Sequence, residues 1–173
     1  AVNLSAYDLL NPDLPQQLSQ LLTKYQVPGS ALALEVTEGA VMQDPQQVIR
    51  NLQQLRSMGI ELAIDDFGTG QSSLAYLKQL PVHEVKIDRA FVKDIENNQN
   101  DELIVVATTQ LAHGLGLRVT AEGLENEAGL AKLIAAGVDK VQGYYFARPL
   151  KADLFMDWMQ AFPTEKTTWF KET

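Results

Sequence analysis

The 173-residue sequence predicts an α/β fold, namely an incomplete (β/α) barrel with a parallel sheet. Short apolar segments alternate with longer segments of helical spacing, which indicates repeated βα units. Polar side chains occur within or directly after six of these short segments, and in a (β/α) barrel the carboxyl ends of the strands meet on one face. No glycine-rich fingerprint follows the first segment, which makes a dinucleotide-binding doubly wound fold less favoured.

Six short apolar segments are predicted as strands. They cover residues 1–4, 31–36, 61–65, 84–88, 117–121 and 140–143. The third segment delivers two adjacent acids, Asp65 and Asp66, to a glycine-rich loop. Because neighbouring side chains on a regular strand point to opposite faces, we expect this strand to end at Asp65, so that both carboxylates can reach one site.

Helical spacing fills the stretches between the predicted strands. The apolar stripes lie within residues 14–22, 48–55, 103–115 and 128–136. Asp44 and Pro45 form an N-cap followed by proline at the first helical position. Gly59, Gly116 and Gly137 follow predicted helices, as C-terminal capping glycines do. A complete barrel has about 250 residues, so this chain corresponds to roughly three-quarters of one.

Composition limits the classes of function. The chain has no cysteine, which excludes disulfides, thiolate chemistry and cysteine-ligated zinc. Its net charge of −8 argues against non-specific DNA binding. No signal-peptide pattern or membrane-spanning apolar run is present, so we expect a cytoplasmic domain; the parent protein can be free or membrane-anchored. The chain starts without methionine inside a predicted strand, as expected of a piece of a longer protein.

The polar residues at the strand ends predict a metal site. A single glutamate at a strand end is most often just solvated, but here oxygen donors recur on successive strands: Asn3, Glu35, Asp65, Asp66 and Glu122. Such donors suit Mg²⁺ or Mn²⁺, with Ca²⁺ as an inert substitute. If Asp65 bridges two ions and Asp66 holds the second, the pair could catalyse an in-line phosphoryl displacement. This pattern predicts a metal-dependent phosphodiesterase.

Lys86 lies on the strand after the paired acids. It could orient or help deprotonate a metal-bound water, screen phosphate charge, or form a salt bridge that only neutralises the acids. The residues alone leave these roles open. His83 is expected to be exposed in a loop and His113 to end a helix, so histidine-based catalysis is not expected.

Six motifs in order resemble the EAL-domain family of bacterial phosphodiesterases, which linearise cyclic di-GMP to pGpG. They are NLS at 3–5, LEVTE at 34–38, AIDDFGTGQSSL at 63–74, LPVHEVKIDRAFV at 80–92, AEGLE at 121–125 and QGYYFARPL at 142–150. The resemblance implies a TIM-like (β/α) barrel of the EAL type, incomplete here. The domain would cover residues 1–162, and residues 163–173 would form a C-terminal tail.

The resemblance also implies roles for individual residues. Asn3, Glu35 and Asp65 would bind a first metal ion, and Asp65, Asp66 and Glu122 a second. Lys86 would position the water nucleophile, which makes Lys86, Glu122 and Asp66 the catalytic set. Glu38 would anchor the glycine loop and Glu125 would support the site. The implied substrate-binding residues are Gln142, Arg148, Pro149 and Leu150, the last three near a guanine base.

Two departures from the family pattern stand out. The Glu-Ala-Leu motif itself is not in this chain, and with it go one metal ligand and a nearby arginine that would contact phosphate. Gln71 stands where family members usually carry tyrosine. Relatives often dimerise and often occur beside GGDEF, PAS or membrane-sensor domains. The loop from Asp66 and the helix after Ser72 would couple a homodimer contact to the site.

Two other functions remain open from the sequence. One is an EAL-like module that binds cyclic di-GMP without cleaving it, and the glutamate of the upstream motif would separate it from an enzyme. The other is a (β/α)-barrel enzyme with unrelated metabolic chemistry, which the specificity of the motif set makes less favoured.

Overall fold

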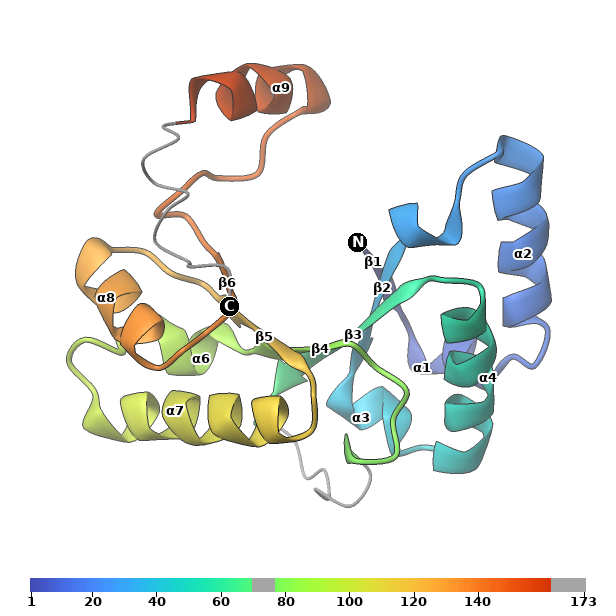
Figure 1. Ribbon diagram of the computed structural model, residues 1–173, viewed down its shortest axis with the longest axis horizontal. Coiled ribbons are helices and arrows are strands. Elements are labelled where there is room, and N and C mark those ends of the chain that lie inside the picture. Colours follow the sequence, from blue (N-terminus) through green and yellow to red (C-terminus); the bar gives the residue numbers. More distant parts are fainter. Residues whose placement is uncertain (70–76, 163–173) are drawn as a thin grey trace.

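The computed structural model describes residues 1–69 and 77–162 (Figure 1). Gln71, Ser72 and the expected tail at 163–173 lie outside the described residues. A parallel sheet runs through the molecule, and its strands are β1 (Val2–Leu4), β2 (Ala33–Thr37), β3 (Glu61–Phe67), β4 (Glu84–Ile87), β5 (Arg118–Glu122) and β6 (Lys140–Gln142). All six predicted strands are therefore present.

The order of the strands in the sheet follows their order in the chain, from β1 to β6. A doubly wound sheet reverses its order at a switch point, whereas a barrel wall adds each new strand beside the previous one. The sheet is thus a six-stranded part of a (β/α) barrel, as the sequence predicts. Among the described residues, β1 and β6 form its two edges.

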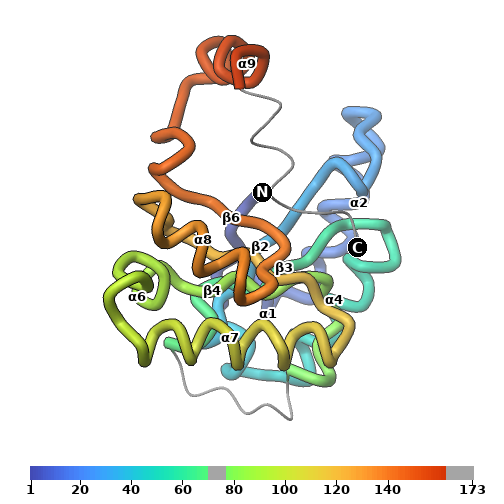
Figure 2. Tube along the Cα trace, turned by 60° about the vertical axis from the view of Figure 1, so that its left-hand side comes forward, coloured from blue at the N-terminus to red at the C-terminus, as the bar shows by residue number. Residues whose placement is uncertain are grey.

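Helices connect the strands and follow the sheet on its outer side (Figures 1 and 2). Helix α4 contacts β3, and α7 contacts β4 and β5. The described helices are α1 (Ala6–Leu10), α2 (Leu14–Tyr25), the short 3₁₀ helix η1 (Gly29–Ala31), α3 (Glu38–Val41), α4 (Pro45–Ser57), α6 (Arg89–Val92), α7 (Gln99–Gly114), α8 (Glu127–Ala135) and α9 (Ala152–Ala161).

The predicted helix ends are confirmed. The Asp44 carboxylate accepts a hydrogen bond from the Gln47 N–H at 3.1 Å, and Pro45 opens α4. The glycines that follow α4, α7 and α8 have φ values of 79°, 75° and 79°. These left-handed conformations favour glycine because it has no Cβ, so each glycine ends its helix sharply.

Alternation along the strands separates two faces of the sheet. Val85 and Ile87 are fully buried in the hydrophobic core, and Lys86 between them points to the opposite, inner face. The same period places Glu35 between buried Leu34 and Val36. Apolar side chains thus face the helices, and the chemistry-bearing side chains face the inside of the barrel wall.

The expectation that the third strand ends at Asp65 is wrong. β3 continues through Asp66 to Phe67, and its register with β4 shifts between Ile64 and Phe67. Asp66 has a φ of 55°, which is unusual for a residue with a side chain. A β-bulge therefore breaks the period-two alternation at this point while the strand goes on.

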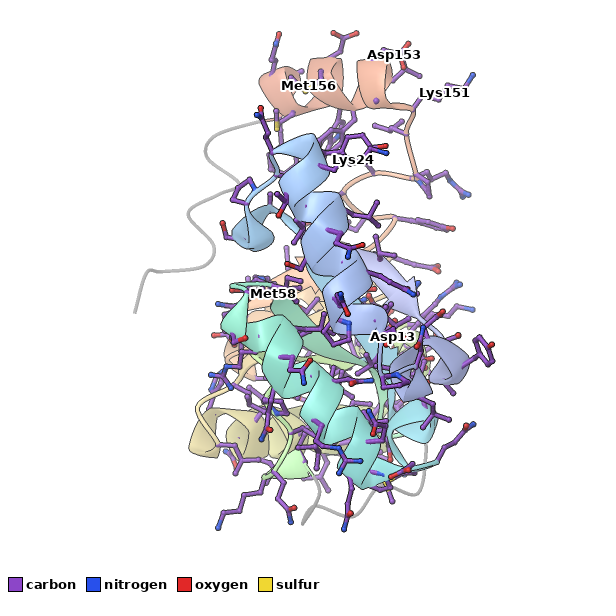
Figure 3. All side chains as sticks on the ribbon, turned by 90° about the vertical axis from the view of Figure 1, so that its right-hand side faces the viewer. Asp13, Lys24, Met58, Lys151, Asp153 and Met156 are labelled. Atoms are coloured by element: carbon purple, nitrogen blue, oxygen red, sulfur yellow. The ribbon has the colours of Figure 1, made fainter. Side chains whose placement is uncertain are left out.

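Helix α9 was not among the predicted helices. It lies at one end of the molecule, away from the helices that follow the sheet, and carries Asp153 and Met156 (Figure 3). Several of its large apolar side chains are exposed, including Leu154, Phe155 and Met159. No described helix combines the length and apolar character that crossing a membrane requires.

The prediction for His83 is wrong and that for His113 is confirmed. His83 is not an exposed loop residue, because its side chain is 24% exposed and its Nδ1 lies 3.1 Å from the Leu62 N–H, which donates to it. Its own N–H donates to the Leu62 carbonyl at 2.9 Å, so the residue extends the contact between β3 and β4. His113 lies in the last turn of α7, as predicted, with Nε2 2.9 Å from Asp139 Oδ2.

A network of ion pairs joins the amino ends of β3 to β6. The Glu84 carboxylate accepts hydrogen bonds from Thr120 Oγ1 and Lys140 Nζ, each at 2.6 Å. Arg118 bridges Glu84 and Glu61. Burial alone would raise the pKa of Glu84, but the hydrogen bonds from Lys140 and Thr120 and the nearby positive charges outweigh it and lower the pKa.

The Glu84→Gln variant tests this network. A carboxylate whose folded-state pKa lies below its ordinary value of 4.5 stabilises the fold fully above that pH, and the effect is lost as the pH falls through the folded-state pKa. We expect the variant to lose about 1 kcal/mol of unfolding free energy at neutral pH, since its charged partners are half-exposed. Urea titrations should show this difference shrink in acid. The exposed Asp157→Asn change should have no such effect, and a loss that is independent of pH would contradict this role.

Candidate active site

Three acidic side chains from three strands surround one lysine. Lys86 Nζ on β4 lies 2.9 Å from Glu35 Oε1, 3.3 Å from Asp65 Oδ1 and 2.7 Å from Glu122 Oε1. The Lys86 side chain is 6% exposed and the three acids are 15–20% exposed. We call these four residues the acid–lysine cluster. The structure thus brings together four of the predicted site residues, which lie between the middle and the carboxyl end of their strands.

Electrostatics in the acid–lysine cluster follow from burial and mutual contact. Burial alone would lower the pKa of Lys86, but hydrogen bonds to Glu122 and Glu35 and the negative charges around it raise the pKa instead. Burial raises the pKa of Glu122, with Lys86 opposing this rise and Asp65 and Glu35 adding to it. One ammonium therefore serves three carboxylates, and the cluster keeps an excess of negative charge.

Asp66 lies beside the cluster because of the bulge in β3. Its N–H donates to Asp65 Oδ1 at 3.1 Å. Burial raises the pKa of Asp66, and the charge of Asp65 and the neighbouring carboxyl group of Asp88 raise it further. Asp88 also accepts a hydrogen bond from the Ala90 N–H at 2.7 Å, which caps α6.

Sequence reasoning did not identify Asp88 as a site residue. The available signal was its position two residues after Lys86, since alternating positions on a strand share a face. Asn3 lies on the edge strand β1, is exposed, and pairs in register with Glu35. Glu38 opens α3 and is buried, and its Oε2 accepts a hydrogen bond from the Gly68 N–H at 3.2 Å, directly after β3.

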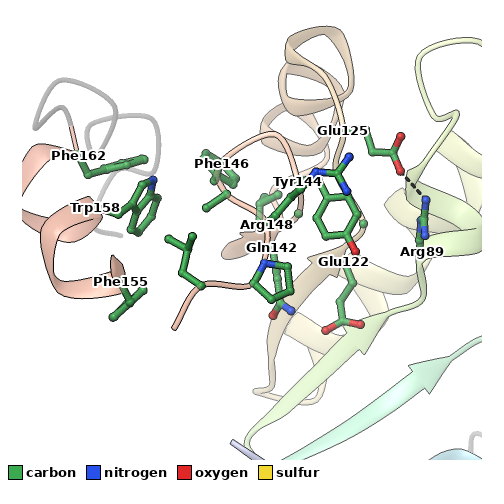
Figure 4. Close-up of a pocket in the computed structure, with 16 residues that line it drawn as sticks. Arg89, Glu122, Glu125, Gln142, Tyr144, Phe146, Arg148, Phe155, Trp158 and Phe162 are labelled. Carbon is green, nitrogen blue, oxygen red and sulfur yellow. Dashed lines mark hydrogen bonds and ion pairs between the residues drawn. The ribbon is translucent and has the colours of Figure 1, made fainter. Parts of the chain in front are cut away.

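A cleft of about 960 Å³ adjoins the cluster at Glu122 (Figure 4). Polar groups line one part of it, including Gln142 and the ion pair between Arg89 and Glu125, whose Nη2 and Oε1 atoms are 2.5 Å apart. Aromatic side chains line another part: Tyr144, Phe146, Phe155, Trp158 and Phe162. The Arg148 guanidinium lies 4.7 Å from the centre of the Tyr144 ring, in a cation–π contact.

The predicted substrate-binding residues all line this cleft. They are Gln142, Arg148, Pro149 and Leu150. Sequence reasoning missed Arg89 and the aromatic residues of α9. Arg89 directly follows Asp88 in a matched motif, which was a usable signal, whereas nothing in the sequence of α9 tied its aromatic residues to the cleft.

Two motif glycines allow close approaches next to the cleft. A Cβ on Gly123 would overlap the Arg89 side chain, and a Cβ on Gly143 would overlap the Leu124 backbone. Gly123 also has a φ of 81°. Both Gly123 and Leu124 donate backbone hydrogen bonds to the Gln142 carbonyl, at 2.8 and 3.2 Å. The glycines therefore let the segments after β5 and β6 pack against each other.

The donor set fits a hard divalent cation, because every candidate ligand offers oxygen. Within residues 1–69 and 77–162, no three acidic or histidine side chains are grouped closely enough to hold a metal ion as they stand. The Lys86 ammonium instead lies within reach of Glu35, Asp65 and Glu122. The chemistry of the donors suits Mg²⁺ or Mn²⁺, and their present arrangement suits an ammonium.

A family profile and individual relatives both match this chain to the same protein family. The EAL domain profile matches residues 1–149. The bifunctional diguanylate cyclase/cyclic di-GMP phosphodiesterase MucR of Pseudomonas aeruginosa is 41% identical over 153 residues, which is 88% of this chain and 22% of that protein. The cyclic di-GMP phosphodiesterase NbdA of the same organism is 41% identical over 162 residues, 94% of this chain and 21% of that protein. The chain spans about a fifth of these relatives.

Solved structures agree with this match. The P. aeruginosa MucR phosphodiesterase in complex with c-di-GMP has a TM-score of 0.84 and 40% identity, and the match covers 88% of this chain and 62% of that one. Klebsiella pneumoniae BlrP1, solved as calcium and manganese complexes with cy-diGMP, has a TM-score of 0.78 and 33% identity, with 85% and 38% coverage.

The Gly123→Ala variant tests the close approach beside the cleft. The added methyl group must displace the Arg89 side chain, and the alanine must hold a strained backbone φ. We therefore expect a loss of about 1–3 kcal/mol in the free energy of unfolding. Gly114→Ala is the matched control, because a Cβ there meets nothing within 4 Å. At the last residue of α7 it should be neutral or stabilise by up to about 1 kcal/mol. Equal effects of the two changes in urea titrations would contradict the packing role of Gly123.

Proposed function

The chain belongs to the EAL domain family, and from that membership we propose that it is the hydrolytic domain of a cyclic di-GMP phosphodiesterase. The proposed reaction is the metal-dependent opening of cyclic di-GMP to pGpG in bacterial second-messenger signalling. The observation that carries the proposal is the acid–lysine cluster at the edge of a cleft that also holds aromatic and cationic groups. Such a cleft offers contacts to both a phosphodiester and a planar base.

The proposed metal ligands are the oxygen donors of the strand ends. We assign Asn3, Glu35 and Asp65 to a first ion and Asp65, Asp66 and Glu122 to a second. Mg²⁺ or Mn²⁺ would be the active metal and Ca²⁺ an inhibitor; the BlrP1 complexes support the binding of manganese and calcium by a relative. When bound, such ions lower the pKa of water and stabilise the charge on the attacking and leaving oxygens.

Lys86 would orient the nucleophilic water and offset phosphate charge. Its ammonium already donates to carboxylates, and a protonated amine is a hydrogen-bond donor and not a proton acceptor. Glu38 would hold the loop after β3 through the Gly68 N–H. Glu125 would fix Arg89 at the wall of the cleft. These residues position groups and do not exchange protons with substrate.

The cleft beyond Glu122 would receive the guanine end of the substrate. We assign Gln142, Arg148, Pro149 and Leu150 to substrate binding, since all four line it. Arg148 over the Tyr144 ring presents a flat cationic surface, which suits both a base and a phosphate oxygen. The aromatic residues of α9 enlarge the apolar part of this wall.

The parent protein would be a multidomain regulator. We propose linkage to a GGDEF, PAS or other sensor domain; the description of MucR as a bifunctional diguanylate cyclase and phosphodiesterase supports a second catalytic domain in the parent. We further propose a homodimer, coupled to the site through the segment around Gln71 and Ser72, and a cytoplasmic location of this domain, with the parent free or membrane-anchored. DNA binding is not proposed, given the net charge of −8.

A binding module without catalysis is the second candidate. It is favoured by the position of the Lys86 ammonium, which occupies the contacts with Glu35, Asp65 and Glu122 that a catalytic metal ion would need. Binding of cyclic di-GMP that persists in EDTA, with no turnover in Mg²⁺ or Mn²⁺, would select this candidate over the enzyme.

The enzymatic proposal predicts a strong effect of Glu122→Gln. In the full-length protein that contains this chain, wild type should convert cyclic di-GMP to pGpG in Mg²⁺. The variant should lose more than about 100-fold in kcat, because it removes a charged oxygen donor from the metal site. The exposed Glu127→Gln change on α8 is the control and should keep full activity. A correctly folded, metal-replete wild type that yields no pGpG would refute the proposal.

Arg148→Ala should separate binding from chemistry. Loss of the cationic surface over Tyr144 should raise KM about tenfold and leave kcat nearly unchanged, because the residue would contact substrate equally before and during reaction. Steady-state kinetics with cyclic di-GMP measure both values. Arg56→Ala on α4, an exposed arginine outside the cleft, should change neither. A fall in kcat without a change in KM would place Arg148 in the chemical step instead.

A further inference from the structure

Three carboxylate oxygens surround the Lys86 ammonium: those of Glu122 and Glu35 accept hydrogen bonds from it, and that of Asp65 makes a longer ion-pair contact. An ammonium carries three donors, and Lys86 Nζ lies 2.7, 2.9 and 3.3 Å from three carboxylate oxygens. Any new contact of Lys86, with a water or a phosphate oxygen, therefore competes with these three. The longest contact is with Asp65, whose Oδ1 also accepts the Asp66 N–H. Asp65 is thus the acid that gives up its contact with Lys86 most readily.

Lys86 cannot leave the cluster for solvent. It is 5% exposed, and its strand β4 lies inside the sheet between β3 and β5. Buried Val85 and Ile87 hold its backbone on either side. A divalent cation that binds the same carboxylates must share a small space with this ammonium, and like charges at such distances repel strongly where water is excluded.

The surroundings make an internal counter-ion necessary when no metal is bound. Three carboxylates lie around Lys86, and Asp66 and Asp88 add further acidic groups nearby. The next cation along the chain, Arg89, is paired with Glu125. Without Lys86, the acids of the cluster would be mostly buried with no described positive partner, and removing one partner of a buried ion pair is strongly destabilising.

We propose that Lys86 competes with the divalent metal for the acids of the cluster. In the metal-free protein it holds Glu35, Asp65 and Glu122 together, and metal binding displaces it from Asp65 first. Displacement releases the ammonium from Asp65, so that Lys86 can turn toward a water only once metal is bound. This inference rests on the metal site of the proposed function, and it makes Lys86 a positioning residue that also sets metal affinity.

Mn²⁺ titrations of the full-length protein that contains this chain, followed by the electron paramagnetic resonance signal of free Mn²⁺, test the competition. Lys86→Met should bind Mn²⁺ at least tenfold more tightly than wild type. Lys140→Met is the matched control: it removes the same charge, but from the ion-pair network at the amino ends of the strands, and should bind within twofold of wild type. In EDTA, Lys86→Met should unfold at a lower temperature than wild type, and Mn²⁺ should raise its Tm more.

A measurement on the unaltered protein covers the case in which Lys86→Met does not fold. In ¹⁵N-lysine-labelled protein, the buried Lys86 ammonium should give a slowly exchanging ¹H–¹⁵N signal in EDTA, assigned by its loss in Lys86→Arg. Saturating Mg²⁺ should shift or abolish this signal and leave that of Lys140 in place.

The outcomes separate the inference from the proposed function. Equal or weaker Mn²⁺ binding by folded Lys86→Met, or a Lys86 signal unchanged by saturating Mg²⁺, overturns the competition while hydrolysis by wild type upholds the enzyme. Failure of wild type and variant alike to bind Mn²⁺ overturns both. Tighter binding by the variant together with a metal-dependent Lys86 signal supports the competition even if cyclic di-GMP is not cleaved.

Discussion

The contact of one buried ammonium with three carboxylates is the interaction on which the site depends. Glu35, Asp65 and Glu122 come from three strands, and Lys86 comes from a fourth. Each acid is mostly buried, so each needs a positive partner or a proton. The shared lysine meets this need and fixes the acids near one another. The close grouping of Glu35, Asp65 and Glu122, which are candidate metal ligands, follows from keeping these four side chains on the inner face.

The fold could be predicted from sequence where local pattern and chain order decide it. Apolar period, strand–helix alternation and the glycines after helices are local signals, and all six strands and the caps of α4, α7 and α8 followed from them. The gathering of the acids also followed, because parallel strands that succeed one another in a barrel wall place their carboxyl ends together. Which carboxylate oxygens contact Lys86 depends on side-chain torsion angles, and these cannot be predicted from the sequence pattern.

The failures have physical causes of a different kind. The bulge at Asp66 needs a left-handed backbone at a non-glycine residue; aspartate adopts it more often than most residues, but too rarely for the sequence to predict it. His83 is covered because its backbone extends the pairing of two strands, a long-range effect. Asp88 and Arg89 follow a strand end, but their importance depends on partners more than 20 positions away in the chain, at Asp66 and Glu125. Helix α9 has several large apolar side chains that stay exposed. Prediction of a helix from a buried apolar stripe therefore does not apply to it.

The two ends of the sheet carry charge in opposite ways. At the amino ends, Glu84 and Glu61 are matched by Arg118 and Lys140, in a network that neutralises itself. At the carboxyl ends, acids outnumber the single lysine among them. One sheet thus separates a neutral ion-pair network from an excess of negative charge that a bound cation or a proton can offset. Changes that strengthen the ion-pair network at the amino ends can therefore raise the stability of the domain without altering the affinity of the proposed metal site. Stability and metal affinity can then diverge independently among related proteins.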